Sequence, residues 1–349
     1  MDSIIILGTS AVDTRLRIVE LLKLNPRGLR QADIARALGI SRSRVSEIVR
    51  ELEKAGLVQR VREGGIELVV LSKQSEVVSD QGQRKRFVLG LVWSSEYPFV
   101  TVFAKILRDR LGITLDVKVY NNGLDATWDL VLGRIDMVLS PLVTQVLYYA
   151  LTDGLRIVGG GAAGGAAVFI NTKGVPGVVS STKASTMELC VTKALRELGI
   201  ADRGRLYRKR GEDIARDLEL GRASLAAIWE PLATRLRMEG FNEVARCLDL
   251  GIVHCCTLAV PSGMNWELAK KISLIYQEAI AVFVREPSRW IEWYSAKVGI
   301  DSAYIARSLE HYVYLPHVDV DRSMDMLSQT GVAVPSPVLL REAVIEVAR

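Results

Sequence analysis

The chain has 349 residues, of which 49% are hydrophobic and 24% are charged. This composition is typical of a folded globular protein and excludes an intrinsically disordered one, and the length predicts two or three domains. The most hydrophobic region, residues 142–170, is interrupted by Asp153, Arg156 and several glycines, which argues against a transmembrane helix. The first residues, MDSIIILGTSAVD, lack the basic start and cleavage site of a secretory signal, so we expect a cytoplasmic protein.

The positive charge is concentrated at the start of the chain. Residues 1–86 hold 16 Lys or Arg and 11 Asp or Glu, whereas residues 87–349 hold 29 of each kind. The whole formal net charge of +5 therefore lies in the first quarter of the sequence. A small basic module joined to a neutral one predicts nucleic acid as the partner of the first module.

The first module shows helical patterns followed by a hairpin. A first helix begins after Ser10, which can cap it, and a second spans residues 30–38. Gly39 permits a tight turn, and Ser41 caps a third helix with the sequence SRSRVSEIVRELEKAG. The stretch LVQRVREGGIELVVLS then predicts two strands joined at Gly64-Gly65. This order is the plan of a winged helix-turn-helix domain.

The segment LRQADIARALGISRSRVSEIVRELEKAGLVQR closely resembles the MarR-like winged-helix regulators of bacteria and archaea, over about residues 10–73. The resemblance implies that the third helix enters the major groove of DNA while the hairpin follows the backbone. Arginines and short hydroxyl side chains suit contacts with base edges and phosphates. The candidate DNA-binding residues are Arg42, Ser43, Arg44, Ser46, Arg50, Arg60 and Arg62. The alternatives are a helix face that is merely solvated, or a winged helix that contacts another protein.

Residues 74–86 predict a linker, because they are polar, lack an apolar face and end in the basic triplet Arg84-Lys85-Arg86. After the linker, strands and helices alternate in two successive sets. This alternation predicts an α/β domain of two lobes with mostly parallel sheets covered on both faces. We expect a DNA-binding domain at residues 1–73 and a ligand-binding domain at 87–349, with its second lobe at about 173–258.

Three stretches within residues 87–345 resemble type II periplasmic binding proteins: FVLGLVWSSEYPFVTVFAKIL with the segments that follow it, ASTMELCVTKALRELGI, and LELGRASLAAIWEPLATRL. The tail SLEHYVYLPHVDVDRSMDMLSQTGVAV also looks like the C-terminal helices of that group. The most similar group binds nitrate, sulfonates, taurine or the pyrimidine precursor of thiamine. The resemblance implies a ligand held between two lobes that close by a hinge motion, against loops and helix N-termini.

The resemblance assigns the candidate ligand-binding residues position by position. They are Trp93, Ser94, Ser95, Glu96, Tyr97, Asn121, Asn122, Ser140, Ser185, Thr186, Trp229 and Glu230. Some of these residue types also have purely structural uses. Ser185 is alternatively a helix N-cap, Trp229 a core residue, and Asn121-Asn122-Gly123 a turn.

The stretch VGGGAAGG at residues 158–165 has the G-x-G-x-x-G spacing of a dinucleotide-binding loop, at Gly159, Gly161 and Gly164. The following AAVFIN predicts a strand where that motif needs a helix, and no carboxylate lies about 20 residues further on to hold a ribose. We therefore expect no cofactor. The stretch is interpreted as a flexible loop facing the cleft, where Gly161 and Gly164 let a ligand approach the backbone.

The chain has four irregularly spaced cysteines, Cys190, Cys247, Cys255 and Cys256, which we expect to be reduced thiols. His254-Cys255-Cys256 contains metal-binding residue types. Neighbouring side chains on a strand point to opposite faces, however, so the three cannot converge on one ion without a bend. The sequence therefore predicts buried thiols and no metal site.

The expected function is that of a one-component transcriptional regulator, which is not an enzyme. It binds palindromic double-stranded DNA as a homodimer and senses a small anion or heterocycle, a logic that resembles LysR-type regulators. Two alternatives stay open. One is an enzyme related to the thiamine-pyrimidine synthases, although their cysteine-rich motif is not reproduced in this sequence. The other is a winged-helix protein whose second domain binds a protein partner.

Overall fold

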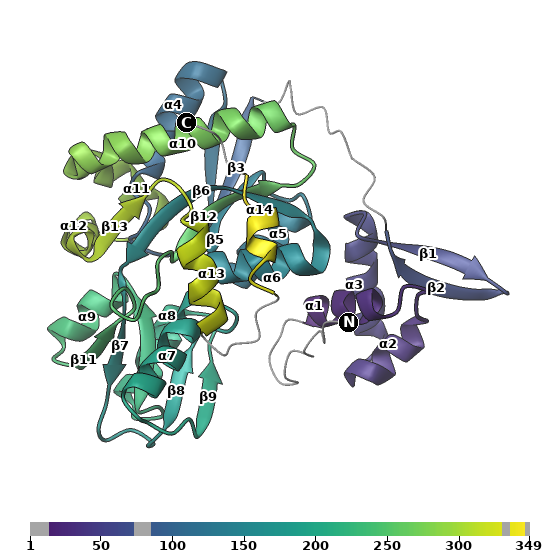
Figure 1. Ribbon diagram of the computed structural model, residues 1–349, viewed down its shortest axis with the longest axis horizontal. Helices are drawn as coiled ribbons and strands as arrows, with labels where there is room; N and C mark the ends of the chain where they lie inside the picture. The colour runs from purple at the N-terminus through teal and green to yellow at the C-terminus, as the bar shows by residue number, and fades with distance from the viewer. Residues whose placement is uncertain (1–13, 73–84, 330–335, 346–349) are drawn as a thin grey trace.

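The computed structural model describes residues 14–72, 85–329 and 336–345. A small helical domain with a two-stranded hairpin lies to one side of a larger α/β domain that is built on two sheets (Figure 1). Ser10, the expected cap of the first helix, and most of the expected linker lie outside the described residues. The helices that the structure describes include none long and apolar enough to cross a membrane.

The first domain has the predicted winged-helix order. Its elements are α1 (Thr14–Leu24), α2 (Gln31–Leu38), α3 (Arg42–Lys54), β1 (Val58–Glu63) and β2 (Ile66–Leu71). Gly39 ends α2 with a left-handed φ of 65°, and the Ser41 hydroxyl caps α3 by accepting a hydrogen bond from the backbone N–H of Arg44. Both predictions are confirmed. The apolar face of α3, Val45, Ile48, Val49 and Leu52, is fully buried in the domain core.

The first lobe is built on a six-stranded sheet with the order β13-β6-β12-β5-β3-β4. Its strands are β3 (Arg86–Val92), β4 (Thr114–Tyr120), β5 (Met137–Pro141), β6 (Leu155–Gly164), β12 (Cys256–Pro261) and β13 (Tyr312–Leu315). The helices that contact it include α4 (Val100–Leu111), α5 (Gly123–Val131), α6 (Leu142–Thr152) and α10 (Trp266–Arg285).

The second lobe is built on a five-stranded sheet with the order β11-β7-β10-β8-β9. Its strands are β7 (Ala166–Ile170), β8 (Val178–Ser181), β9 (Gly204–Tyr207), β10 (Leu225–Trp229) and β11 (Asn242–Arg246). The helices α7 (Thr186–Glu197), α8 (Gly211–Glu219) and α9 (Leu232–Met238) pack on it. This sheet begins before the expected start of the lobe at residue 173, and β12 belongs to the other sheet, so the lobe does not follow the expected range 173–258.

The prediction of mostly parallel sheets is wrong, because both sheets are mixed. Strand β3 is parallel to β4 and β5, and β8 is parallel to β9 and β10. Strands β6, β7, β11, β12 and β13 all make antiparallel pairs. Helices connect β3 to β4 and β8 to β9, as parallel neighbours require. In contrast, β6 leads directly into β7 of the second sheet, and after β11 the chain goes back to the first sheet as β12.

The glycine stretch is a strand, so its interpretation as a flexible loop that faces the cleft is wrong. Strand β6 continues through it, and Gly161 pairs with Thr257 on β12 and with Leu315 on β13. A Cβ on Gly161 would lie 2.1 Å from the carbonyl oxygen of Cys256, and one on Gly164 would lie 2.2 Å from that of His311. Glycine is therefore needed for close approach of neighbouring strands, not of a ligand.

The end of the chain contains one strand that the expected run of helices did not include. After α10 come α11 (Ile291–Val298) and α12 (Ser302–Ser308), then β13, which pairs with β6 in the first sheet. Helices α13 (Val320–Gln329) and α14 (Leu339–Ala343) follow. The tail thus completes the edge of the first lobe.

Two of the four cysteines form a disulfide, which corrects the expectation of four reduced thiols. Cys190 on α7 is bonded to Cys247 just after β11, with 5.3 Å between their Cα atoms. The two residues are 57 positions apart in sequence and are brought together by the packing of the second lobe. Cys255 and Cys256 are free and buried.

Candidate functional site

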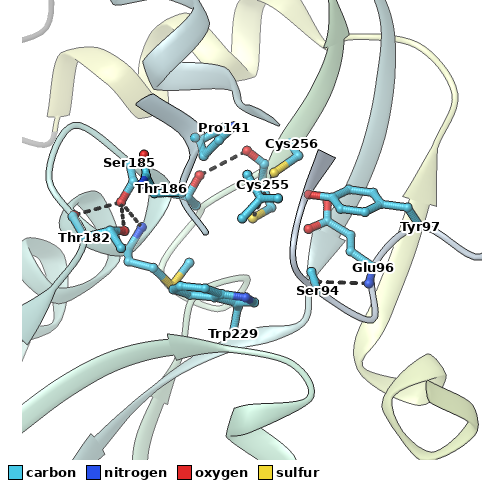
Figure 2. Close-up of a pocket in the computed structure, with 14 residues that line it drawn as sticks. Ser94, Glu96, Tyr97, Pro141, Thr182, Ser185, Thr186, Trp229, Cys255 and Cys256 are labelled. Atoms are coloured by element: carbon cyan, nitrogen blue, oxygen red, sulfur yellow. Dashed lines mark hydrogen bonds between the residues drawn. The ribbon is translucent and has the colours of Figure 1, made fainter. Parts of the chain in front are cut away.

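A pocket of about 380 Å³, its open mouth included, lies between the two lobes (Figure 2). Seven of the predicted ligand-binding residues line it: Ser94, Glu96, Tyr97, Asn122, Ser185, Thr186 and Trp229. Most of this volume is open to solvent, and the space enclosed between the walls is far smaller than that of a typical small-molecule site. In this arrangement of the lobes the pocket therefore has room for only a very small group.

The segment after β3 forms one wall of the pocket. The Ser94 hydroxyl donates to the carbonyl oxygen of Glu230 at 3.2 Å, and its oxygen accepts from the backbone N–H of Glu96 at 3.1 Å. The Glu96 side chain is almost fully buried, and its Oε1 has no hydrogen-bond partner. Burial raises the pKa of Glu96 well above the ordinary glutamate value, which favours the neutral form of its carboxyl group.

The start of α7 forms the opposite wall, in the second lobe. The Ser185 hydroxyl caps this helix by accepting from the backbone N–H groups of Met187 and Glu188. Its structural alternative as an N-cap is therefore confirmed, although it also lines the pocket. The Thr186 hydroxyl donates to the carbonyl oxygen of Cys255 at 3.0 Å, and the Trp229 indole N–H donates to that of Trp93 at 2.8 Å. The lobes are thus in contact at the pocket.

The third wall is the start of α5 in the first lobe. Asn122 caps α5 by accepting from the backbone N–H of Asp125 at 2.9 Å, and its amide group donates to the Asp125 carboxylate. The other oxygen of that carboxylate accepts a hydrogen bond at 2.8 Å from Arg15 on α1 of the winged helix. One pocket residue is therefore a single side chain away from the winged-helix domain.

The other predicted ligand-binding residues do not line the pocket: Trp93, Ser95, Asn121, Ser140, Gly161, Gly164 and Glu230. Ser95 faces the hydroxyl of Tyr312, and Ser140 faces that of Thr127. Glu230 is fully buried in an ion pair of 2.5 Å with Arg237. The side chains of Ser95, Ser140 and Glu230 thus contact other protein groups instead of the pocket.

The remaining lining residues were missed: Val92, Gly123, Pro141, Thr182, Met187, Cys255 and Cys256. The cysteines had the clearest signal, since both belong to the His254-Cys255-Cys256 cluster. Cys255 lies at a bend just before β12, so both thiols reach the pocket. His254 turns away, and its Nε2 accepts from the backbone N–H of Asp319 at 3.0 Å.

The predicted DNA-binding residues lie mostly on open surface. Arg42, Ser43 and Arg44 are exposed at the start of α3, and Ser46 is half-buried. Arg50 lines a groove between α3 and the first lobe, where Arg134 of the lobe forms an ion pair of 2.6 Å with Glu51. On the hairpin, Arg62 is exposed, whereas Arg60 lies between Glu53 at 3.2 Å and Glu67 at 3.4 Å.

Comparison with known proteins supports both halves of this architecture. A family model described as winged helix-turn-helix DNA-binding matches residues 13–59. The periplasmic aliphatic sulphonate-binding protein of Escherichia coli has a similar structure, with a TM-score of 0.62 and 16% identity over 76% of this chain and 94% of its own. The chain joins a winged helix-turn-helix to a periplasmic-binding-protein-like domain. This confirms the two resemblances seen in the sequence.

Two further structures have the same fold. The alkanesulfonate-binding protein of Xanthomonas axonopodis pv. citri, bound to MOPS, gives a TM-score of 0.62 and 16% identity over 75% of this chain and 98% of its own. The periplasmic nitrate-binding protein of Synechocystis PCC 6803 gives 0.61 and 12% over 75% and 86%. Comparison of the sequence with curated proteins finds no match. At these identities the structural similarity establishes the fold alone.

Proposed function

We propose that this protein is a one-component transcriptional regulator that senses a small molecule in the pocket between its lobes. The winged helix binds double-stranded DNA, and ligand binding changes the position of that domain. Both parts of the chain have folds used for binding, which supports a regulator over an enzyme.

The observation that carries this proposal is the path from Asn122 through Asp125 to Arg15. Asn122 lines the pocket, and Arg15 belongs to the winged helix. Lys209 of the second lobe also approaches Asp125, at 3.7 Å. Movement of the second lobe against the first therefore changes the surroundings of the carboxylate that holds α1. A ligand that binds one arrangement of the lobes more tightly shifts the equilibrium toward that arrangement, and with it the position of the DNA-binding domain. The size of the shift is set by the difference between its affinities for the two arrangements.

The pocket chemistry supports a small heterocycle or a singly charged anion as the ligand. None of the described residues that line it is Lys or Arg, which disfavours a multiply charged anion. Trp229 and Tyr97 offer aromatic surface, and α7 directs its partially positive N-terminus at the same space. Sulfonate and nitrate, the ligands named for proteins of similar fold, are the first anions to try.

We also propose that the protein acts as a homodimer in the cytoplasm, on a palindromic operator with half-sites about one helical turn apart. A palindromic DNA site has the same two-fold symmetry as a homodimer. The start of α3 is exposed, so it can enter a major groove. The Cys190–Cys247 disulfide is compatible with this location, since some organisms keep disulfides in intracellular proteins.

The test is selection of DNA sequences by the full-length protein, followed by measurement of operator affinity with and without a library of small anions and heterocycles. We expect a preferred palindrome and at least one compound that changes its affinity about fivefold or more. Absence of sequence preference at moderate salt would overturn the regulator proposal. Chemical turnover of a bound compound would instead favour the enzyme alternative.

A binding-defective variant makes the same experiment specific to the pocket. Trp229→Leu removes aromatic surface from the lining and the hydrogen bond to Trp93, so it should abolish the compound's effect while DNA binding without compound is retained. Trp266→Leu is the matched control, because Trp266 is half exposed at the start of α10 and does not line the pocket. An equal loss in both variants would contradict a role of the pocket.

A further inference from the structure

Three side chains with metal-binding atoms meet inside the pocket. The sulfurs of Cys255 and Cys256 and a carboxyl oxygen of Glu96 all lie within 4.8 Å of one another, and all three residues are buried. The two sulfurs are 4.0 Å apart. Figure 2 shows Glu96 and the two cysteines on neighbouring walls of the pocket, with the Glu96 carboxyl group directed toward the thiols.

The convergence of the two cysteines depends on the bend before β12. Alternation along a regular strand would send neighbouring side chains to opposite faces, which is why the sequence argued against a shared ion. Cys256 is the first residue of β12, and Cys255 precedes the strand at the bend. The backbone there is held by the N–H of Cys255, which donates to Ala162, and by its carbonyl oxygen, which accepts from Leu142 and Thr186. The bend thus presents both thiols to one space.

We propose that Cys255, Cys256 and Glu96 form a binding site for a thiophilic divalent cation of the Zn²⁺ class. Two thiolates and one carboxylate are a ligand set that Zn²⁺ accepts in proteins. Hard cations such as Mg²⁺ and Ca²⁺ prefer oxygen ligands only, so the two sulfurs select against them.

The distances suit such an ion. Two thiolate sulfurs on a tetrahedral Zn²⁺, each at about 2.3 Å, are about 3.8 Å apart. The observed separation of 4.0 Å needs almost no change in the positions of the sulfurs. The carboxyl oxygen must move closer by a small rotation of the Glu96 side chain, and its Oε1 has no competing hydrogen bond to lose.

The electrostatics of the three groups favour a cation over the empty site. The two thiols and the carboxyl group are crowded in a buried space, where they cannot all be ionised without a cation. The cation binds as each ligand gives up its proton to solvent, so binding is accompanied by proton release. Affinity therefore rises with pH.

A cation at this position has three protein ligands and leaves one coordination position open to the pocket. Zinc sites with three protein ligands bind water or a small molecule at the fourth position. The cation would thus supply the positive charge that the pocket lining lacks, and an anionic effector could bind to it. This regulatory meaning rests on the proposed function, whereas binding of the cation itself does not depend on DNA.

The test is titration of metal-free full-length protein with Cd²⁺ and Co²⁺, which report thiolate ligation by charge-transfer absorption. Thiol counting first verifies that the Cys190–Cys247 disulfide is intact and that Cys255 and Cys256 are the free thiols. We expect one metal per chain, a thiolate charge-transfer band and visible Co²⁺ bands typical of tetrahedral geometry. Cys255→Ser and Cys256→Ser should remove the band, and Glu96→Gln should weaken binding by about tenfold or more.

The matched control is Met238→Leu, because Met238 is exposed at the end of α9 and does not line the pocket. It should bind metal with the affinity of the unaltered protein. Melting of each metal-free variant shows whether it is folded, and the alanine variant of the same cysteine replaces a serine variant that is not. Binding without a charge-transfer band, or unchanged binding in folded variants of both cysteines, would overturn the site. Metal binding that leaves the effect of every tested anion on operator affinity unchanged would overturn the regulatory role of the cation but not the site.

Discussion

The guanidinium group of Arg15 donates to the carboxylate of Asp125 at 2.8 Å, across the boundary between the winged helix and the first lobe. The two side chains are 17% and 35% exposed, so solvent screens the pair only in part. Arg15 also lies over the ring of Trp128, with 5.2 Å between its Cζ and the ring centroid. This relationship joins the winged helix to α5, the helix whose start lines the pocket.

Removing this pair should loosen the attachment of the winged helix. In a double-mutant cycle of Arg15→Ala and Asp125→Asn, we expect an interaction free energy of about 1 kcal/mol in unfolding of the full chain. The same variants should reduce the effect of an active compound on operator affinity, because the winged helix no longer follows α5. Denaturation by urea and operator titration measure the two effects.

A surface pair provides the comparison for that cycle. Lys105 and Asp109 form an exposed ion pair of 2.6 Å along α4, four residues apart. Such pairs contribute about 0.3–0.5 kcal/mol, and this one should not alter the response to a compound. An interaction free energy for Arg15 and Asp125 below this value would argue against the attachment.

The exposed start of α3 should determine which DNA sequence is bound. Arg42→Ala or Arg44→Ala removes a side chain that can contact a guanine edge, so we expect a loss of about 1–3 kcal/mol in discrimination between operator and mutated operator. Fluorescence anisotropy with both DNAs measures this difference. Arg108→Ala, an exposed position on α4, should leave it unchanged.

Arg62 on the hairpin should behave differently from the arginines of α3. If it contacts phosphate, Arg62→Ala weakens binding to all sequences to a similar extent and reduces the slope of log affinity against log salt by about 1. Salt titrations with operator and unrelated DNA measure both quantities. A loss confined to the operator would assign Arg62 to base recognition.

The disulfide should stabilise the second lobe. It closes a loop of 57 residues, for which the loss of chain entropy in the unfolded state predicts up to about 4 kcal/mol. The double variant Cys190→Ala/Cys247→Ala should therefore unfold at lower urea concentration than the unaltered protein. Dithiothreitol should reproduce the shift in the unaltered protein and have no further effect on the variant, and a reductant effect of equal size in both would contradict the assignment.

Asp129 should make the contact between the domains sensitive to acid. Burial raises the pKa of Asp129, but hydrogen bonds from Lys118, Tyr120 and Arg134 outweigh burial and bring the pKa below the ordinary aspartate value. Arg134 also pairs with Glu51 on α3. Because the pKa is lower in the folded state than in the unfolded state, this stabilisation is complete above the unfolded value, near 4, and is lost as pH falls through the folded value.

The variant Asp129→Asn tests whether ionised Asp129 stabilises the folded protein and whether this stabilisation is lost in acid. It keeps a hydrogen-bond acceptor but does not ionise, so the free energy of unfolding should fall less steeply below about pH 4 than in the unaltered protein. Asp321→Asn is the control, because Asp321 is 84% exposed in its ion pair with Arg341. Equal acid dependence in the unaltered protein and the Asp129 variant would contradict the assignment.

Much of the fold could be predicted from local patterns. The α3 helix, its cap at Ser41 and the turn at Gly39 follow from residue preferences that act within a few positions. The alternation of strands and helices in the two lobes could also be predicted, since their apolar periodicity is local. The glycine stretch was misread because glycines usually mark loops, whereas here they allow neighbouring strands to pack closely on β6.

The site was predicted in part for the same reason. Residues that follow strands or begin helices, such as Ser94 and Ser185, lie where the order of elements places them. Whether a side chain faces the pocket or a neighbouring wall depends on packing that adjacent positions do not reveal. Ser94 lines the pocket, whereas Ser95 faces Tyr312 from a distant part of the chain.

The sequence by itself determined the two modules, the helix α3 with its exposed basic start and the general position of the pocket, because each depends on short-range periodicity, capping or charge. Only the tertiary structure decided which residues separated by long stretches of chain meet. It paired Cys190 with Cys247, brought Glu96 to Cys255 and Cys256, and placed Arg15 on Asp125. Each of these contacts depends on how whole sheets and helices pack, which no local pattern encodes.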